Sequence, residues 1–243
     1  MIGCLVGSEM CIRDSLKNSY KVLARKYRPK NFEDLMGQEI MVQTLKNAFK
    51  TNRIAHAYIL TGVRGIGKTT TARLLARSLN YETDQINEPN IEMPEIGKHC
   101  EEIMESRHID VIEMDAASRT GIADIREIID SINYSPSSAR YKIYIIDEVH
   151  MLSKAAFNGL LKTLEEPPAH VKFIFATTEV QKIPLTILSR CQRFDLRRFD
   201  NDMIRSLINK VCEKEMVSID DQIINLIARA SGGSARDSLS LLD

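Results

Sequence analysis

Short apolar runs recur along the chain, and segments with apolar residues at helical spacing separate them. The runs are rich in β-branched and aromatic residues, as in strands that are buried on both faces of a sheet. They occupy residues 56–61, 109–115, 141–146 and 171–178. Strands that alternate with helices predict a parallel sheet covered by helices, so we expect an α/β fold.

The last part of the chain has a different pattern. Residues 201–211 and 220–229 place apolar side chains at helical spacing and begin with acidic residues, which favour a helix N-terminus. Gly232 and Gly233 then end the second of these helices and precede a third. This part of the chain is therefore expected to be all-helical.

A glycine-rich turn follows the first expected strand. Residues 62–69 match the pattern GxxxxGK[ST], and residues 70–79 continue as a helix. A strand, a glycine-rich turn and a helix N-terminus together present backbone N–H groups and a positive dipole to anionic oxygens. A nucleoside triphosphate is the expected ligand. The alternative is a glycine turn before a basic helix, and the agreement of both flanking elements argues against it.

Each residue type in this turn has a physical role. Gly62, Gly65 and Gly67 allow positive φ angles and a close approach of the backbone to phosphate. Lys68 supplies a positive charge for the β and γ phosphates, and the hydroxyl of Thr69 is suited to binding Mg²⁺. We therefore expect a nucleoside triphosphate with Mg²⁺ at this turn.

An acidic pair follows the strand expected over residues 141–146. Asp147 and Glu148 would lie at the edge of the sheet where α/β proteins bind ligands. Asp147 would hold Mg²⁺ through water, and Glu148 would polarise the attacking water. The alternative is a simple helix N-cap, which the upstream phosphate loop disfavours. Thr178 is placed to bond the γ-phosphate or this water, although by itself it reads more readily as a capping hydroxyl.

Several motifs occur together in one order. They occupy residues 24–39, 62–69, 147–152, 164–168 and 189–191. From about Ser19 to its end, the chain resembles the AAA+ ATPase region of the gamma and tau subunits of bacterial DNA polymerase III, the clamp-loader motor. Ser189, Arg190 and Cys191 form the element that is characteristic of clamp-loader ATPases.

The resemblance implies a role for further residues. Thr178 matches the sensor 1 position, and Arg236 matches sensor 2. Arg190 matches the finger that reaches the γ-phosphate of a neighbouring subunit, although a solvated surface arginine is the ordinary alternative in a chain that is 27% charged. The expected nucleotide-binding residues are Tyr27, Arg28, Leu35, Met36, Gly62, Gly65, Gly67, Lys68, Thr69, Thr70 and Arg236. The expected catalytic residues are Lys68, Asp147, Glu148, Thr178 and Arg190, and the expected Mg²⁺ ligands are Thr69 and Asp147.

One departure from the family concerns zinc. Relatives carry four cysteines of a zinc module, and the matching positions here hold Tyr81, Pro94, Gly97 and Cys100. A single thiolate cannot form a four-ligand zinc site, even with His99 and His108 nearby. We expect no zinc, and in its place a polar, acidic and mobile excursion over residues 82–98, in which residues 86–90 have little to build a core with.

These patterns divide the chain into expected parts. Residues 1–18 lack the features of a secretory signal and are expected to be a non-native or disordered leader. Residues 19–197 form the expected nucleotide-binding α/β core, and residues 198–243 form a helical lid that is incomplete because its last helical pattern breaks off.

Composition narrows the function class. The five cysteines show no framework spacing, and no apolar run reaches the ~18 residues of a transmembrane helix, so we expect a cytoplasmic protein without a membrane contact. The formal net charge is zero, so any DNA surface must be a local patch.

The resemblance implies an ATPase that loads a sliding clamp onto primed DNA within a hetero-pentameric ring of clamp-loader subunits. Two alternatives stay open. One is another AAA+ ATPase of DNA metabolism, such as a branch-migration motor, and Arg190 in its motif counts against it. The other is a scaffold that binds ATP without hydrolysing it, and the intact Lys68, Asp147 and Glu148 count against that.

Overall fold

The computed structural model describes residues 21–118 and 122–243. The expected leader over residues 1–18 lies outside the described residues. Within the described ranges, no helix is both long and apolar enough to cross a membrane.

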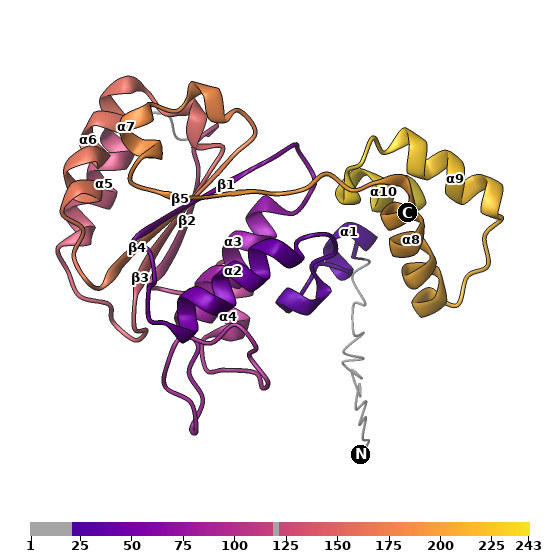
Figure 1. Cartoon of the computed structure of the whole chain (residues 1–243), viewed down its shortest axis with the longest axis horizontal. Coiled ribbons are helices and arrows are strands. Elements are labelled where there is room, and N and C mark those ends of the chain that lie inside the picture. Colours follow the sequence, from indigo (N-terminus) through magenta and orange to yellow (C-terminus); the bar gives the residue numbers. More distant parts are fainter. Residues whose placement is uncertain (1–20, 119–121) are drawn as a thin grey trace, which may run out of the picture.

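The described residues form a five-stranded, all-parallel sheet with the strand order β2-β3-β4-β1-β5 (Figure 1). The strands are β1 (Ala57–Thr61), β2 (Val111–Asp115), β3 (Lys142–Asp147), β4 (Val171–Thr177) and β5 (Gln192–Asp195). The predicted α/β fold class is confirmed, and the four apolar runs correspond to β1 through β4. Because all strands are parallel, their carboxyl ends meet at one edge of the sheet.

The edge strand β5 is absent from the prediction made from sequence. Only Phe194 of its four residues is buried, and two charged residues, Arg193 and Asp195, flank it. Its place depends on parallel pairing with β1, and the hydroxyl of Thr61 donates to the Asp195 carboxylate. Such a short strand lacks the apolar run that identifies its neighbours.

Helices cover both faces of the sheet (Figure 1). Successive strand residues point to opposite faces, so Tyr58 and Leu60 join one apolar cluster while Ile59 joins the other. The first face is covered by α2 (Glu39–Lys50), α3 (Lys68–Leu79) and α4 (Cys100–Met104), and the second by α5 (Ile122–Ile132), α6 (Lys154–Glu165) and α7 (Leu185–Leu188). Short 3₁₀ helices lie at η1 (Phe32–Asp34), η2 (Val149–Met151) and η3 (Val180–Lys182). The strands are therefore buried from both sides, as their composition predicted.

The C-terminal helices build a separate small core. They are α8 (Asn201–Glu215), α9 (Asp221–Ala230) and α10 (Ala235–Leu242), and we call them the lid. Asp200, Asp220 and Ser234 each cap one of these helices by accepting a backbone N–H. The lid core contains Ile204, Ile208, Cys212, Ile224 and Ala228. The three predicted helices are therefore present, while a domain boundary near residue 197 stays a prediction.

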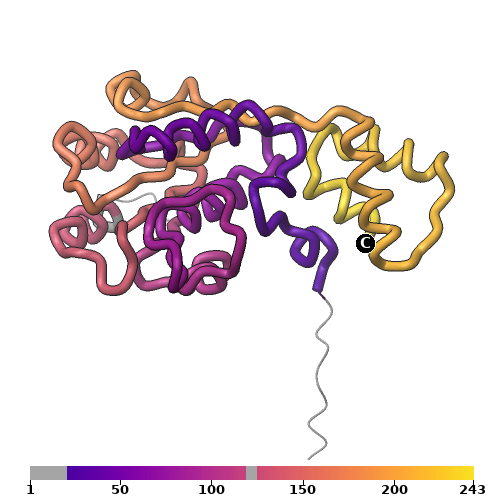
Figure 2. The backbone as a smooth tube through the Cα atoms, turned by 60° about the horizontal axis from the view of Figure 1, so that its bottom comes forward, coloured from indigo at the N-terminus to yellow at the C-terminus, as the bar shows by residue number. Residues whose placement is uncertain are grey.

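The N-terminal segment links the core to the lid. The views in Figures 1 and 2 place helix α1 (Leu23–Lys26) between them. The side chains of Lys26 and Tyr27 both bond Oε1 of Glu215 at the end of α8, at 2.5 and 2.6 Å. This contact holds Tyr27, one of the expected nucleotide-binding residues, against the lid.

The excursion over residues 82–98 is attached to the core by apolar side chains. Ile91 and Met93 are each only 4% exposed and pack into the core of the first face. Both lie just after residues 86–90, and the mobility of the excursion stays a prediction. Tyr81, at a former zinc-ligand position, is buried and shares two hydrogen bonds with the backbone of Glu95.

The remaining cysteine is also held by hydrogen bonds. Sγ of the buried Cys100 accepts from Nε of Arg77 at 2.8 Å and from the backbone N–H of Gly97 at 3.2 Å. The described residues contain no group of three or more His, Cys, Asp and Glu side chains arranged to hold a metal ion.

The purified protein is expected to contain no stoichiometric zinc, because Tyr81, Pro94 and Gly97 replace three of the four ligands and Cys100 alone cannot form the site. Elemental analysis of protein purified without chelator measures this directly. Removing structural zinc unfolds small metal modules. A protein that holds no zinc should therefore keep the same melting temperature when a chelator is added. One equivalent of zinc, or a lower melting temperature in chelator, would contradict the expectation.

Candidate nucleotide-binding site

The glycine-rich turn has the backbone geometry that its sequence predicts. Gly62, Gly65 and Gly67 all have positive φ angles, of 145°, 78° and 99°. A Cβ added to Gly67 would meet no atom within 4 Å, so the backbone there borders open space. Helix α3 begins at Lys68, and its first N–H groups have no partner within the helix. The turn is therefore suited to bind phosphate oxygens.

The ammonium group of Lys68 lies over the turn. Its Nζ donates to the backbone carbonyls of Gly62 and Val63, at 3.0 and 3.1 Å. Burial lowers the pKa of Lys68, and the nearby Glu148 and Asp147 oppose that shift. The charge therefore points into the turn, where the β and γ phosphates of a bound nucleotide would lie.

Thr69 and Asp147 come together at the carboxyl end of β3. The Thr69 hydroxyl donates to Oδ2 of Asp147 at 2.5 Å. Both side chains offer hard oxygen ligands, and Mg²⁺ in phosphate sites commonly uses one or two such groups and keeps several waters. The two residues therefore fit the Mg²⁺ that was predicted for them.

Glu148 follows Asp147 in a left-handed backbone conformation, with φ 46°. Its Oε2 accepts from the backbone N–H and the hydroxyl of Thr178, at 3.2 and 3.0 Å. The adjacent strands β3 and β4 thus bring the two predicted residues into direct contact. A contact of Thr178 with the γ-phosphate or the attacking water stays a prediction.

Most of these residues, but not Gly62 or Thr178, line one large cleft of about 1010 Å³ between the core and the lid. The predicted residues that line it are Tyr27, Arg28, Leu35, Met36, Gly65, Gly67, Lys68, Thr69, Thr70, Asp147, Glu148 and Arg236. Burial lowers the pKa of Arg28, and the charge of Arg73 adds to that effect. The structure therefore gathers most of the predicted nucleotide site at one place.

The lid contacts the phosphate loop directly. The backbone N–H of Arg236 donates to the carbonyl of Gly65 at 3.1 Å. A Cβ on Gly65 would lie 2.0 Å from the hydroxyl oxygen of Ser234. Glycine is therefore required at this position both by its φ angle and by the close approach of α10.

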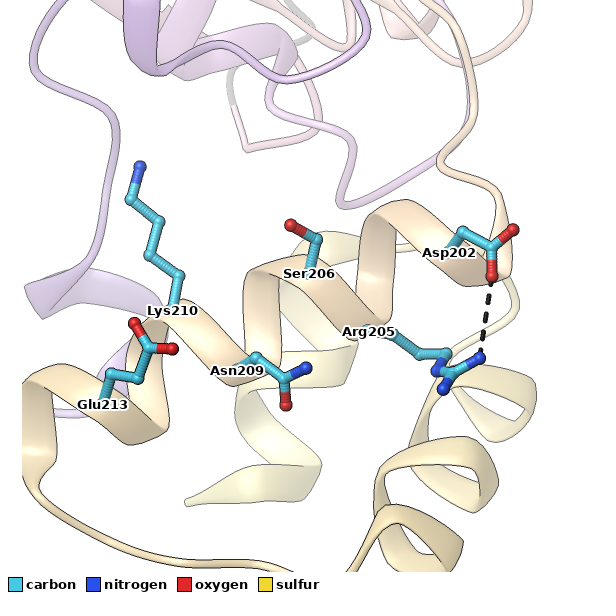
Figure 3. A pocket seen from close by; sticks show the side chains of 6 residues that line it. All are labelled: Asp202, Arg205, Ser206, Asn209, Lys210 and Glu213. Atoms are coloured by element: carbon cyan, nitrogen blue, oxygen red, sulfur yellow. Dashed lines mark ion pairs between the residues drawn. The ribbon is translucent and has the colours of Figure 1, made fainter.

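The lid also contributes two lysines that the sequence analysis missed. Lys210 and Lys214 of α8 line the same cleft. Figure 3 shows Lys210 projecting from the polar face of α8. Asp202 and Arg205 form an ion pair on the same helix, near its N-terminus. Basic residues on the polar face of the predicted helix could have indicated a site for an anion. The sequence alone, however, does not show what this face contacts.

Arg190 does not line the cleft. Its Nη2 bonds Oε1 of Glu165 and its Nη1 bonds the carbonyl of Thr186, both at 2.7 Å. The Arg190 side chain remains 33% exposed. Arg190 therefore lies outside the nucleotide site of its own chain. A residue that acts on a neighbouring subunit must lie outside its own site in this way.

Known proteins match both parts of the chain. Residues 37–200 match the family described as DNA polymerase III, delta subunit, and residues 203–243 match the family described as DNA polymerase III clamp loader subunit, ATPase lid domain. The tau subunits of DNA polymerase III from Salmonella typhimurium and Bacillus subtilis are 49% and 48% identical over 93% of the chain. The chain belongs to the DNA polymerase III gamma/tau family.

Members of the gamma/tau family can be considerably longer than this chain, which spans 34% of the Salmonella tau subunit and 39% of the Bacillus one. Solved structures of the Thermotoga maritima RuvB branch migration motor share the fold, with a TM-score of 0.62 at 21% identity. That alignment covers 88% of the chain and 63% of the RuvB chain. The AAA+ core with a helical lid is thus the shared architecture.

In this gamma/tau-family chain, Lys68→Ala is expected to weaken ATP binding about 10- to 100-fold, because charged hydrogen bonds to the phosphates are lost. Calorimetry with ATP and Mg²⁺ measures the change. Lys154→Ala, which removes an exposed lysine from the start of α6, is the matched control and should bind as the unchanged chain does. Unchanged affinity of Lys68→Ala would contradict the phosphate-loop assignment.

Proposed function

We propose that this chain is the ATPase motor of a DNA polymerase III clamp loader, which uses ATP to load a sliding clamp onto primed DNA during replication. The observation that carries the proposal is the convergence of Lys68, Asp147 and Glu148 on one cleft. Membership of the gamma/tau family supports it. The cleft is large enough for a nucleotide and is bordered by basic groups from both the core and the lid.

The binding step uses groups at the start of α3. Lys68 exchanges its two backbone carbonyl partners for phosphate oxygens, and the N–H groups of the turn bind the same anion. Thr69 and Asp147 would hold Mg²⁺, which neutralises phosphate charge during phosphoryl transfer. Tyr27, Arg28, Leu35 and Met36 would surround the adenine and ribose.

The hydrolytic step depends on Glu148. Its Oε2 is held by Thr178, which leaves Oε1 to accept a hydrogen bond from the attacking water. A carboxylate oriented in this way polarises the water against the γ-phosphorus. Arg236 lines the lid side of the cleft, where its charge would stabilise the phosphates.

Arg190 would complete a neighbouring site. Its partner Glu165 is 52% exposed, and exposed ion pairs contribute little, so the guanidinium can be transferred to a phosphate at small cost. Such a residue makes hydrolysis depend on the assembled ring.

The partners follow from the same proposal. They are the other subunits of a hetero-pentameric clamp loader, the sliding clamp and primed DNA, in the cytoplasm and without a membrane contact. The chain matches only part of these gamma and tau relatives, from 32% of a Haemophilus influenzae tau/gamma subunit to 61% of a Buchnera gamma subunit. Assembly with these partners is therefore proposed for the protein that contains this region.

Two alternative functions can be tested together with the proposed one by measuring the ATPase rate. A branch-migration motor shares the fold, and a scaffold would bind ATP without hydrolysing it. The positions of Lys68, Asp147 and Glu148 favour hydrolysis over the scaffold.

The deciding measurement is the ATPase rate of the chain assembled with the other loader subunits. It is measured alone, with clamp, with primed DNA, with clamp and primed DNA together, and with four-way junction DNA. The proposal expects the highest rate with both. Stimulation by four-way junction DNA in preference to primed DNA would support the branch-migration motor, and ATP binding with no turnover would support the scaffold.

A further inference from the structure

A histidine close to the catalytic carboxylate has no role in the proposed mechanism so far. The side chain of His150 in η2 is only 6% exposed. Its Nδ1 lies 3.0 Å from Oγ1 of Thr177 and 3.4 Å from Oε2 of Glu148. Its Nε2 lies 3.3 Å from Oε1 of Glu179. The imidazole is therefore buried between two carboxylates that belong to different segments.

The contacts of Glu148 converge on one oxygen. Oε2 accepts from the N–H and the hydroxyl of Thr178, and Nδ1 of His150 approaches the same atom. Oε1 has no such contact among the described residues. His150 and Thr178 therefore approach the same oxygen of the carboxylate, so that the other oxygen is the one offered to water.

The hydroxyl of Thr177, the last residue of β4, also lies against the ring. Its oxygen, which lies beside Nδ1, accepts the backbone N–H of Glu179 at 3.0 Å. On the other side of the ring, the Glu179 carboxylate beside Nε2 pairs with Lys182 at 2.9 Å. Thr177 and Glu179 thus flank the two nitrogens of the ring.

We propose that His150 is a positioning residue for ATP hydrolysis, which holds the Glu148 carboxylate toward Thr178 and is itself oriented by Glu179. The inference rests on the proposed function, because it has meaning only where Glu148 polarises the attacking water. Small displacements of a catalytic group reduce rates strongly, whereas nucleotide binding does not depend on this carboxylate.

Asparagine and glutamine variants of His150 can distinguish the roles of its two ring nitrogens. Asparagine places its amide nitrogen near the position of Nδ1, and glutamine places it near that of Nε2. His150→Asn thus keeps a nitrogen beside Glu148 and Thr177 and loses the contact with Glu179, while His150→Gln does the reverse. A role in packing alone would not distinguish them.

The experiment measures kcat, KM and ATP affinity for the chain assembled with the loader subunits, together with the melting temperature of each variant. His150→Ala is expected to lower kcat about 10- to 100-fold, with KM and affinity within about two-fold of the unchanged protein. His150→Asn should recover most of the rate, and His150→Gln should not. Glu179→Gln should lower kcat by a smaller factor. Met151→Ala, at the exposed neighbouring position in η2, is the matched control and should be unchanged.

A double variant tests whether His150 acts through Glu148. Glu148→Gln with His150→Ala should be no slower than Glu148→Gln alone, because residues that act as a unit are not additive. Additive losses, equal rates for His150→Asn and His150→Gln, or an unchanged kcat for His150→Ala would each overturn the inference. If Glu148→Gln itself retained the full rate, the proposed role of Glu148 would fail, so the two failures are distinguishable.

Discussion

Arg190→Ala is expected to reduce hydrolysis in the assembled, DNA-stimulated complex on the order of 10³-fold, as removal of an arginine finger does in related phosphoryl-transfer enzymes. ATP binding by the isolated chain should stay nearly unchanged, because Arg190 bonds Glu165 and Thr186 and does not line the cleft. Calorimetry of the isolated chain and steady-state ATPase of the complex provide the two measurements.

Mixed assemblies locate the effect. A subunit that carries Arg190→Ala should disable the site of its neighbour and leave its own site active. Arg193→Ala, which removes another partly exposed, ion-paired arginine nearby, is the matched control and should retain the stimulated rate. If Arg190→Ala lost nucleotide binding as an isolated chain, or kept the full stimulated rate in the complex, the residue would be structural or simply solvated.

Glu148→Gln is expected to bind ATP with unchanged affinity and to hydrolyse it about 10²- to 10⁴-fold more slowly, the range of general base catalysis. The glutamine keeps the size of the side chain and an oxygen that can accept from Thr178, but it loses the basic carboxylate. Single-turnover hydrolysis and equilibrium binding separate the two effects.

Glu127→Gln serves as the control for Glu148→Gln, because Glu127 is an exposed carboxylate on α5. It should hydrolyse ATP at the unchanged rate. Turnover of Glu148→Gln near that rate would mean that another group polarises the water.

The strands were predictable where burial is complete. In β1 and β4 every residue is buried, so sequence and structure agree within a residue or so. The exposed edge strand β5 carries no such run, and only its pairing with β1 defines it. The packing of the loop after Tyr81 was missed for a related reason, since Ile91 and Met93 are isolated in sequence and are brought to the core by the fold.

The same distinction applies to the site. The phosphate loop and the acidic pair are contiguous in sequence, so their chemistry could be predicted from residue types and spacing. The contacts of His150 with Glu179, and the place of Lys210 in the cleft, join segments far apart in the chain. They depend on strand pairing and on the position of the lid, which no local pattern encodes.

The contact between α10 and the phosphate loop has a thermodynamic consequence. The N–H of Arg236 and the side chain of Ser234 reach Gly65 only when the lid is in this position. If a bound nucleotide shifts the lid, lid position and occupation of the loop share a coupling free energy, and such coupling is reciprocal. A partner that prefers one lid position would then change the affinity for ATP by the same factor by which ATP changes the affinity for that partner. Partner and nucleotide would thus change each other's affinity without touching each other.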